Sequence, residues 1–498
     1  MGAFWSQISR DEDLEGMYDQ RQGKPSIPPS LLCGVLILQY FDDVSDREAA
    51  DRVRYDLRWK MALDLSVDDP GFHYSTLSRF RSRLMQHGQE RYAFDKLVEL
   101  AITAGFLKRD GEQVIDSTPI HGAAALQDTY ALLRNAIRKV LLAMGRNPAK
   151  SRQRAKRLGM SQYLTQRKPE LDWSDPKARR EHLQQIVADA ERLIAEIETT
   201  SIPDGSDAQG ALALLEQILA QDIDTDDDGQ HEIKQGVAKD RVISTVDPEM
   251  RHGRKSSSKR FDGYKGHVSV DTDSELVTEV TVTPANVYDA EAVEPLLDNE
   301  AAHHDIKPKT VVGDQSVIDA ERRRILAERE IEAVGKVPIR RPGGRYAKAD
   351  FDIDLDQGTV TCPAGHTVDK SKAQRDKKGR VGRCFTFPRQ LCHDCPLREQ
   401  CTTAEQTGRT VTLNPQEALL QAALEKQNQE DFRDRYCYPR STVERVIGHL
   451  TRHGFRHARY LGEAKTLLQA FWSAAAVNLQ KLMGFLSDGK GEQAIGMV

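Results

Sequence analysis

An aspartate that closes a short apolar β-run constrains this chain more than any other feature. The run is Val114-Ile115-Asp116-Ser117-Thr118-Pro119-Ile120, and two further acids follow far downstream in comparable settings. Asp314 closes a second strand-like run, residues 309–314, and Glu444 lies in a helical stretch, residues 440–448. Rigid backbone holds a side chain at the end of a strand, which suits a metal ligand.

Two strand-end aspartates and a helical glutamate form the donor set that two-metal phosphoryl transfer needs. Each Mg²⁺ ion prefers oxygen ligands and keeps open positions for water and phosphate oxygens. Two such ions about 4 Å apart can activate the attacking oxygen and stabilise the leaving one. Alone, Asp116 could form a strand-end turn, Asp314 could cap a helix, and Glu444 could pair with Arg440 or Arg445. Together, in this order and with basic sequence around Glu444, the three acids favour catalysis.

At these residues the chain resembles the DDE transposases of bacterial insertion sequences, which have an RNase H-like catalytic core. The resemblance runs from about residue 15 to about residue 485. Its most specific piece lies near the C-terminus: Ser441-Thr442-Val443-Glu444-Arg445, then Gly448, His453-Gly454 and Arg456-His457-Ala458-Arg459-Tyr460. Related transposases often carry a Tyr, an Arg and a Lys at set spacings around the glutamate. Here Arg440 matches, while the other two positions hold Cys437 and Thr451.

The resemblance implies a mixed α/β fold with four parts. Residues 1–110 would form a helical N-terminal DNA-binding domain, and residues 111–120, 236–340 and 431–484 the RNase H-like core. Residues 121–235 would be an all-α insertion and residues 341–430 a Cys-rich insertion. The strands expected in the core are 111–120, 264–271, 276–282, 309–314 and 332–338, because apolar residues alternate or cluster there. Asp116 and Asp314 would then lie at the ends of neighbouring strands, with Asp247, Asp271 and Asp289 as rival acids.

Basic residues gather in two segments, although the formal net charge of the chain is −5. Between Arg134 and Arg180 there are fourteen Lys and Arg against three acids, and between Arg435 and Arg459 six Arg against Glu444 alone. Local basic surfaces attract phosphates whatever the total charge, although solvated helix faces would explain the first segment equally well. The expected DNA contacts are Arg79, Arg81 and Arg83 on an N-terminal helix that suggests a helix-turn-helix, and Lys336, Arg440, Arg445 and Arg452 near the site.

Five of the seven cysteines lie in the Cys-rich insertion. Cys392-His393-Asp394-Cys395 is followed by Cys401 and preceded by Cys362, a spacing that fits a tetrahedral Zn²⁺ site. Cys384 and His366 are possible substitute ligands, and reduced, unliganded cysteines are the alternative. Disulfides are disfavoured in the cytoplasm, which is the expected compartment because the first 20 residues lack a signal-peptide core and no long apolar run suggests a membrane span.

The function expected from the resemblance is DNA transposition. Mg²⁺, or Mn²⁺ in its place, would be held by Asp116, Asp314 and Glu444, and the protein would cut element ends and join the 3′-OH ends to target DNA. Its partners would be double-stranded DNA and further copies of the chain, in a homodimer or larger synaptic complex of a bacterial cytoplasm, at the nucleoid when bound to DNA. A catalytically inactive, domesticated DNA-binding protein and a metal-dependent nuclease without strand transfer are the alternatives.

Overall fold

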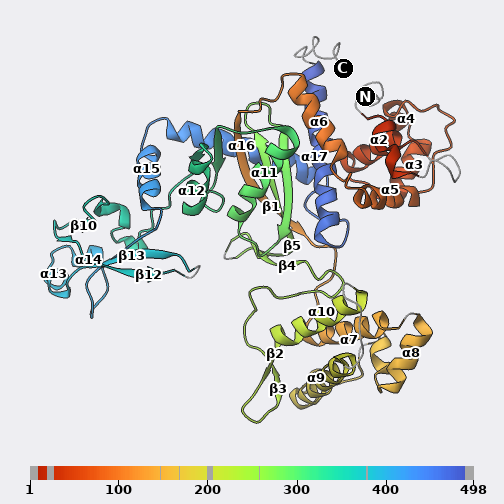
Figure 1. Ribbon diagram of the computed structural model, residues 1–498, viewed down its shortest axis with the longest axis horizontal. Helices are drawn as coiled ribbons and strands as arrows, with labels where there is room; N and C mark the ends of the chain where they lie inside the picture. The colour runs from red at the N-terminus through yellow and green to blue at the C-terminus, as the bar shows by residue number, and fades with distance from the viewer. Residues whose placement is uncertain are drawn as a thin grey trace.

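The structure is a computed structural model of the chain, and its centre is a mixed β-sheet (Figure 1). It describes residues 9–18, 27–145, 147–165, 167, 169–198, 206–256, 258–376 and 379–487. Within these residues no helix is long and apolar enough to cross a membrane.

Six strands form the sheet. β6 (Val277–Pro284), β5 (Arg260–Asp271) and β1 (Glu112–His121) are antiparallel neighbours, and β7 (Thr310–Gly313) and β8 (Glu332–Val334) continue the sheet parallel to β1. The short β4 (Arg251–Arg254) pairs with the first residues of β5. This arrangement is consistent with the predicted RNase H-like core.

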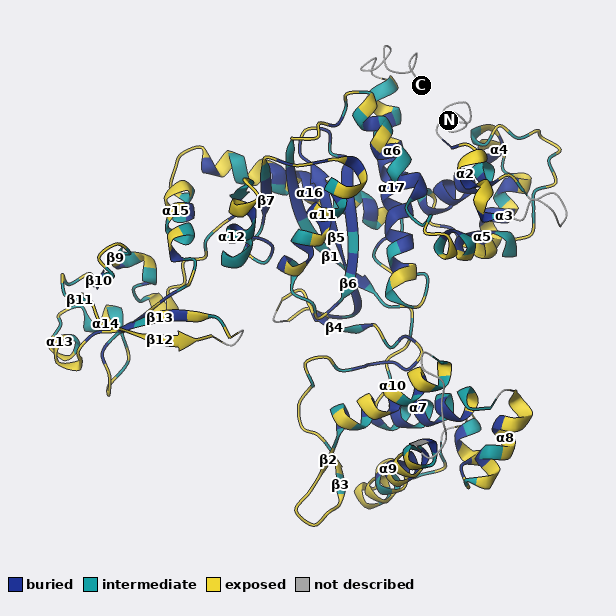
Figure 2. Ribbon diagram, in the orientation of Figure 1, coloured by how far each residue is buried: buried dark blue, intermediate teal, exposed yellow. Residues whose placement is uncertain are grey.

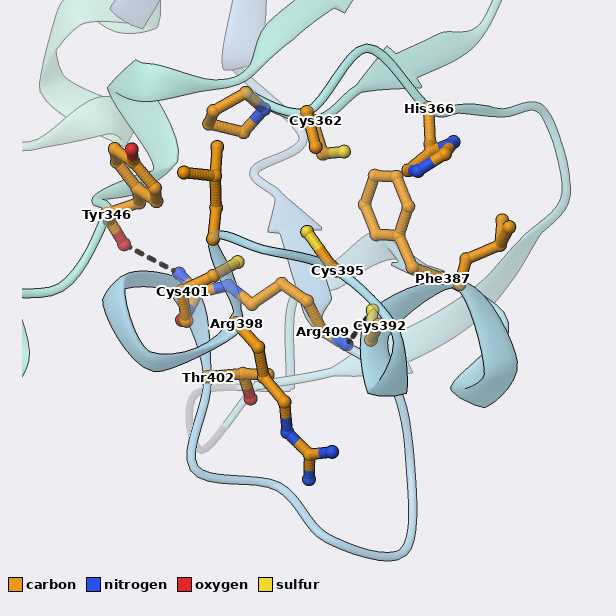
Figure 3. Close-up of a pocket in the computed structure, with 14 residues that line it drawn as sticks. Tyr346, Cys362, His366, Phe387, Cys392, Cys395, Arg398, Cys401, Thr402 and Arg409 are labelled. Carbon is orange, nitrogen blue, oxygen red and sulfur yellow. Dashed lines mark hydrogen bonds between the residues drawn. The ribbon is translucent and has the colours of Figure 1, made fainter.

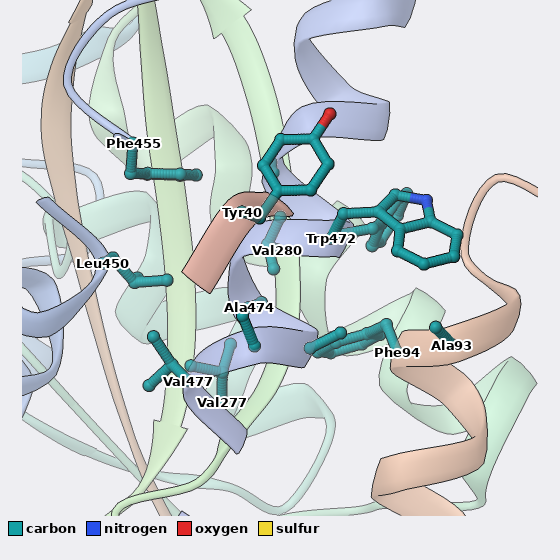
Figure 4. Packing of buried hydrophobic residues seen from close by; sticks show 14 of the residues in the cluster. Tyr40, Ala93, Phe94, Val277, Val280, Leu450, Phe455, Trp472, Ala474 and Val477 are labelled. Atoms are coloured by element: carbon teal, nitrogen blue, oxygen red, sulfur yellow. The ribbon is translucent and has the colours of Figure 1, made fainter. Parts of the chain in front are cut away.

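Helices cover both faces of the sheet because neighbouring strand residues point to opposite sides. Ile115 and Val311 pack with α11 (Val293–His304) and α12 (Ala320–Glu328), whereas Val114 and Val312 belong to the larger core on the other side. That larger core also contains apolar residues of α16 (Phe432–Arg452) and α17 (Glu463–Ser487). Figure 4 shows Trp472, Ala474 and Val477 of α17 packed beside Val277 and Val280 of β6.

The N-terminal helices share this larger core. They comprise a 3₁₀ helix, η1 (Glu12–Met17), and α2 (Pro29–Phe41), α3 (Asp46–Tyr55), α4 (Leu57–Ala62), α5 (Ser75–Gln86) and α6 (Tyr92–Thr103). α2 and α6 both contact α17, and Phe94 of α6 packs against Phe471 with ring centroids 5.7 Å apart. The first 110 residues are therefore joined to the sheet region by continuous apolar packing.

The helical insertion has a core of its own. It contains α7 (Thr129–Ala143), α8 (Pro148–Arg157), η2 (Ser161–Leu164), α9 (Pro176–Glu198) and α10 (Asp207–Asp222), whose apolar residues pack among themselves (Figure 2). It is not purely helical, because β2 (Ile223–Thr225) and β3 (His231–Ile233) form a small hairpin around an acidic turn. Asp226 makes this turn possible by accepting hydrogen bonds from the backbone N–H groups of Asp228 and Gln230.

The Cys-rich insertion contains two small antiparallel sheets. One comprises β9 (Asp352–Asp354), β10 (Thr359–Thr361) and β11 (Thr367–Val368), and the other β12 (Ser371–Arg375), β13 (Val381–Thr386) and β14 (Thr410–Leu413). Short helices α13 (Arg389–His393) and α14 (Arg398–Cys401) lie between β13 and β14 in the chain. Its small core consists mainly of Phe351, Val360, Phe385 and Phe387, and α15 (Glu417–Gln427) leads back to the sheet.

Candidate functional site

The three acids line one cavity at the end of the parallel strands. Ile115 of β1 lies opposite Gly313 of β7, so the next residues, Asp116 and Asp314, are neighbours across the sheet. Glu444 reaches the same cavity from α16, which packs against β1. The cavity has a volume of about 510 Å³.

Asp116 is held in place by two hydrogen bonds. Its Oδ1 accepts a hydrogen bond from the backbone N–H of Ser117 (2.8 Å), and its Oδ2 accepts one from Nη2 of Arg440 (2.9 Å). Burial raises the pKa of Asp116, and the Arg440 guanidinium offsets this in part while the nearby Asp314 adds to it. The charge of Asp116 therefore depends on a nearby cation.

Asp314 is oriented by the turn that follows β7. Its Oδ1 accepts hydrogen bonds from the hydroxyl of Ser316 (2.6 Å) and from the backbone N–H groups of Ser316 (2.7 Å) and Val317 (3.0 Å). Its Oδ2 has no hydrogen-bond partner among the described residues, which leaves that oxygen open to a ligand from the cavity. Asp314 is not the helix cap that the sequence allowed, because Asp319 caps α12; Asp314 instead closes the turn with one carboxylate oxygen and leaves the other for a ligand.

Glu444 lies one helical turn after Arg440 and its side chain is 68% exposed. Nη2 of Arg440 is 3.8 Å from Oε1 of Glu444, so this guanidinium lies between Glu444 and Asp116. Nη1 of Arg440 is buried and has no hydrogen-bond partner in the described chain. A buried donor of this kind needs an acceptor, and a phosphate oxygen in the cavity would supply one.

One of the three rival acids also lines the cavity. Asp289 accepts hydrogen bonds from Nζ of Lys265 (2.6 Å) and from the hydroxyl of Ser316 (3.1 Å), which links it to Asp314. Asp289 was expected only as a rival acid and Lys265 was not expected, because the sequence does not show that β5 lies beside η3 (Asp289–Ala292), the 3₁₀ helix that follows β6.

The other two rivals lie elsewhere. Asp247 accepts a hydrogen bond from the hydroxyl of Tyr264 (2.7 Å), and Asp271 closes the β5–β6 turn by accepting hydrogen bonds from the backbone and hydroxyl of Ser274. Both acids are buried and serve local structure.

Further cations reach the cavity from β4 and from the segment after α16. Arg254, Lys255 and Arg456 line it, and Nε of Arg456 is buried without a hydrogen-bond partner in the described chain. The hydroxyl of Thr451, at the spacing where related proteins carry Lys, lines the cavity and is likewise unpartnered. The signal for the first two was the basic run of residues 251–260, which lies outside the two basic segments singled out in the sequence.

Three of the cations expected near the site do not line the cavity. Arg445 pairs with Glu275 (2.6 Å), Nζ of Lys336 lies 4.8 Å from the ring centroid of Tyr436, and Nε of Arg452 donates to the carbonyl of Gly448. A contact of these three side chains with DNA therefore stays a prediction, at positions outside the cavity. The position of Arg445 on α16 turns it toward the β5–β6 turn.

The three N-terminal arginines differ in how far they are exposed to solvent. Arg81 is buried, pairs with Asp46 and lies over the ring of Tyr460, so it is part of the core and not a DNA contact. Arg83 is half-buried over the ring of Tyr18. Arg79 is exposed on α5 and its Nη2 donates to the hydroxyl of Ser75 (2.7 Å).

Four cysteines of the Cys-rich insertion surround a second, small cavity (Figure 3). Cys362, Cys392, Cys395 and Cys401 line it together with His366, whereas Cys384 lies in β13 away from it. Burial raises the pKa of the Cys401 thiol, and the other three thiols add to this rise. All seven cysteines are free thiols. Across the described residues, no group of three or more His, Cys, Asp or Glu side chains is arranged to hold a metal ion as it stands.

Two segments of the chain match known protein families. Residues 361–483 match the family described as Transposase DDE domain, and residues 4–83 match the Transposase domain (DUF772). These two matches support a DDE transposase of an insertion sequence. No curated protein and no solved structure matches it. The first match contains Glu444 and the four clustered cysteines of this transposase, while Asp116 and Asp314 precede it.

The residues of the transposase cavity fit the divalent metal that its family implies. Asp116 and Asp314 are neighbouring carboxylates, the second with an open oxygen, and hard oxygen donors suit Mg²⁺. Binding would require Arg440 to leave Oδ2 of Asp116, since that guanidinium now occupies the space between Asp116 and Glu444. The arrangement can therefore supply three carboxylates to metal and several cations to phosphate.

Proposed function

We propose that this transposase cuts the ends of its element and joins the freed 3′-OH ends to target DNA. The observation that carries the proposal is the convergence of Asp116, Asp314 and Glu444 on one cavity that also holds unpartnered arginine nitrogens. Carboxylates for metal and cations for phosphate in one cavity are what phosphoryl transfer requires.

Asp116, Asp314 and Glu444 would hold two Mg²⁺ ions, which supply activation of the attacking oxygen and stabilisation of the leaving oxygen. Arg440 would move from Asp116 to a non-bridging oxygen of the scissile phosphate, and Arg456 would contact the same strand. Lys265 and Ser316 would keep Asp289 and Asp314 in position through their hydrogen bonds. Water would break the phosphodiester to leave a 3′-OH, and this hydroxyl would then attack the target phosphorus as the target 3′-oxygen leaves.

The N-terminal helices would read the element ends, with exposed Arg79 of α5 as a DNA contact and half-buried Arg83 beside it. Because two ends must be cut and joined together, the active species would be a homodimer or a larger synaptic complex. It would act in the bacterial cytoplasm, on double-stranded DNA.

The experiment is cleavage and joining of labelled element-end DNA in Mg²⁺ and in Mn²⁺, with wild type and Asp314→Ala. Joined products from wild type that vanish in the variant support the proposal. Cut ends without joined products favour the metal-dependent nuclease. DNA binding without cutting, on authentic element ends, favours the inactive, domesticated protein. Equal activity of wild type and variant removes Asp314 from the site.

We also propose that Cys362, Cys392, Cys395 and Cys401 bind a structural Zn²⁺ ion. The four cysteines line one small cavity, and four thiolates are a donor set of tetrahedral structural zinc sites (Figure 3). Cobalt substitution tests this, because thiolate-bound Co²⁺ gives sulfur-to-metal absorption. Cys395→Ser should lose that absorption and Cys384→Ser should retain it. Equal spectra for the two variants would contradict the assignment.

A further inference from the structure

The helical insertion contains a groove that the cutting reaction does not use. It has a volume of about 700 Å³ and lies along one face of α7, away from the helix's own apolar core. Arg134, Arg138 and Lys139 line it from α7, and Arg167 faces them from the segment after η2. One face of α7 is buried in the core of the insertion, and the basic residues of the other face line the groove.

The four cations of this groove have few carboxylates near them: Asp128 caps α7, and Asp247 interacts electrostatically with Lys139. None of the four cations forms an ion pair with a described residue, and Nε of Arg138 is buried with no hydrogen-bond partner there. Arg134 donates only to the carbonyl of Arg167 (3.2 Å) and lies over the ring of Tyr163. Positive charge that is concentrated and unpaired in a concavity favours an anionic ligand.

Three other arginines, two of the insertion and one directly after it, do form ion pairs. Arg157 pairs with Glu196, Arg192 with Asp189, and Arg241 with Asp222. The one acid in the groove wall, Asp128, accepts a hydrogen bond from the backbone N–H of Ala131 and so caps α7. The insertion therefore pairs some of its cations with acids and leaves those of the groove without one. Lys150, Arg152 and Lys156 of α8 also form no ion pair with a described residue, but they are exposed and do not line the groove.

Aromatic side chains complete one wall of the groove. Tyr130 and Trp173 meet edge to face with ring centroids 5.3 Å apart, and Trp173 is 39% exposed. Unpaired bases stack on exposed rings of this kind while their phosphates bind nearby cations. A cavity of this volume is too small for a duplex but accommodates a short piece of one strand.

We propose that this groove binds an unpaired segment of DNA, with phosphates on Arg134, Arg138, Lys139 and Arg167 and a base against Trp173. Thr245 and Val246 form part of its lining, and the next residue, Asp247, is hydrogen-bonded to Tyr264 of β5. The groove is thereby tied to the strand that also carries Lys265 of the catalytic cavity. The inference shares with the proposed function only the premise that DNA is the polymer bound.

Binding of a labelled oligothymidylate of about 20 nucleotides, longer than a typical single-strand site, tests the groove. The measurement is made in EDTA, so it does not depend on cutting. The test protein is Arg134→Gln/Arg138→Gln/Lys139→Gln, and the matched control is Lys150→Gln/Arg152→Gln/Lys156→Gln, which removes three charges from the exposed face of α8. The groove variant should bind at least about tenfold more weakly, with a salt slope lower by about 2, because each lost phosphate contact contributes about 0.7.

The control variant should retain wild-type affinity within about twofold, since exposed charges outside the groove touch no phosphate. Equal losses of affinity in the two variants, or no binding of the oligonucleotide by wild type, would overturn the proposal that the groove binds unpaired DNA. Wild type that cuts and joins element ends while the two variants bind alike would remove the groove and keep the proposed function. Wild type that binds the oligonucleotide through the groove but never cuts element ends would keep the groove proposal and contradict the proposed function.

Tryptophan fluorescence tests the stacking step. Trp59 and Trp472 are 3% and 1% exposed, so Trp173 is the most accessible indole of the described chain. Oligothymidylate should quench wild type, and Trp173→Phe should lose most of that quenching while keeping most of its affinity through the cations and the remaining ring. Quenching that is unchanged in Trp173→Phe would place the base elsewhere.

Discussion

At the scale of single residues, Arg440 contacts two of the three acids of the site and could also contact phosphate. It neutralises buried Asp116, approaches Glu444 and keeps one buried nitrogen unpaired. Arg445, five residues later on the same helix, is paired with Glu275 outside the cavity. Substituting each arginine in turn therefore distinguishes a role in the site from a general effect of positive charge on α16.

Arg440→Met should slow cleavage of element-end DNA by at least about tenfold, because it removes a charge-assisted contact to the scissile phosphate. Arg445→Met should remain within a few-fold of wild type. Cleavage rates at saturating DNA measure both. A larger loss in Arg445→Met than in Arg440→Met would reverse the assignment of the two side chains.

Glu300 of α11 gives a prediction about pH. It is fully buried, accepts a hydrogen bond from the hydroxyl of Thr278, and burial raises its pKa to about 8. A carboxyl whose pKa is higher in the folded state than in the unfolded state costs stability as pH rises between the two values. Glu300→Gln removes that ionisation, so its stability relative to wild type should increase by roughly 3 kcal/mol between pH 5.5 and pH 8.

Urea unfolding of both proteins at the two pH values measures this difference. A stability difference that is the same at pH 5.5 and pH 8 would show that Glu300 does not titrate on unfolding.

At the scale of elements, Asn478 fastens α17 to the sheet. Its side chain accepts a hydrogen bond from the backbone N–H of Val277 (2.9 Å) and donates one to the carbonyl of the same residue (2.8 Å). Asn478→Leu leaves both backbone groups buried and unpaired, so it should cost roughly 2–4 kcal/mol. Ser473→Ala on the same helix should cost little, because the buried Ser473 hydroxyl has no partner in the described chain. Comparable losses in the two variants, measured by urea unfolding, would contradict this account.

Local pattern predicted the elements better than it predicted their partners. The alternation of β5 and β6, Asp116 within β1 and Asp314 directly after β7 are local features, and the Arg440–Glu444 approach follows from helical spacing. Arg81 was misread because its partner, Asp46, lies on another helix. The same limit applies to Arg445 and Glu275, which are 170 residues apart. Only packing of the whole chain brings such pairs together.

At the scale of the whole molecule, the cores define which parts can fold alone. The helical insertion has its own apolar core, whereas the N-terminal helices share theirs with α17 and the sheet. Residues 127–245 expressed alone should therefore give a helical circular dichroism spectrum and cooperative unfolding. Residues 27–110 alone should be far less stable, because the faces of α2 and α6 that contact α17 would be exposed to water. Equal stability of the two fragments would contradict this division.

The central claim is that Asp116, Asp314 and Glu444 act as one metal-dependent site, and element-end cleavage by single variants tests it most directly. Asp116→Asn, Asp314→Asn and Glu444→Gln should each lose at least about a hundredfold in cleavage rate while still binding DNA, because metal coordination supplies several kcal/mol of transition-state stabilisation. The control is Asp271→Asn, since Asp271 also ends a strand but lies in a turn outside the cavity. Cleavage within about tenfold of wild type by any of the three, with Asp271→Asn equally active, would contradict the claim.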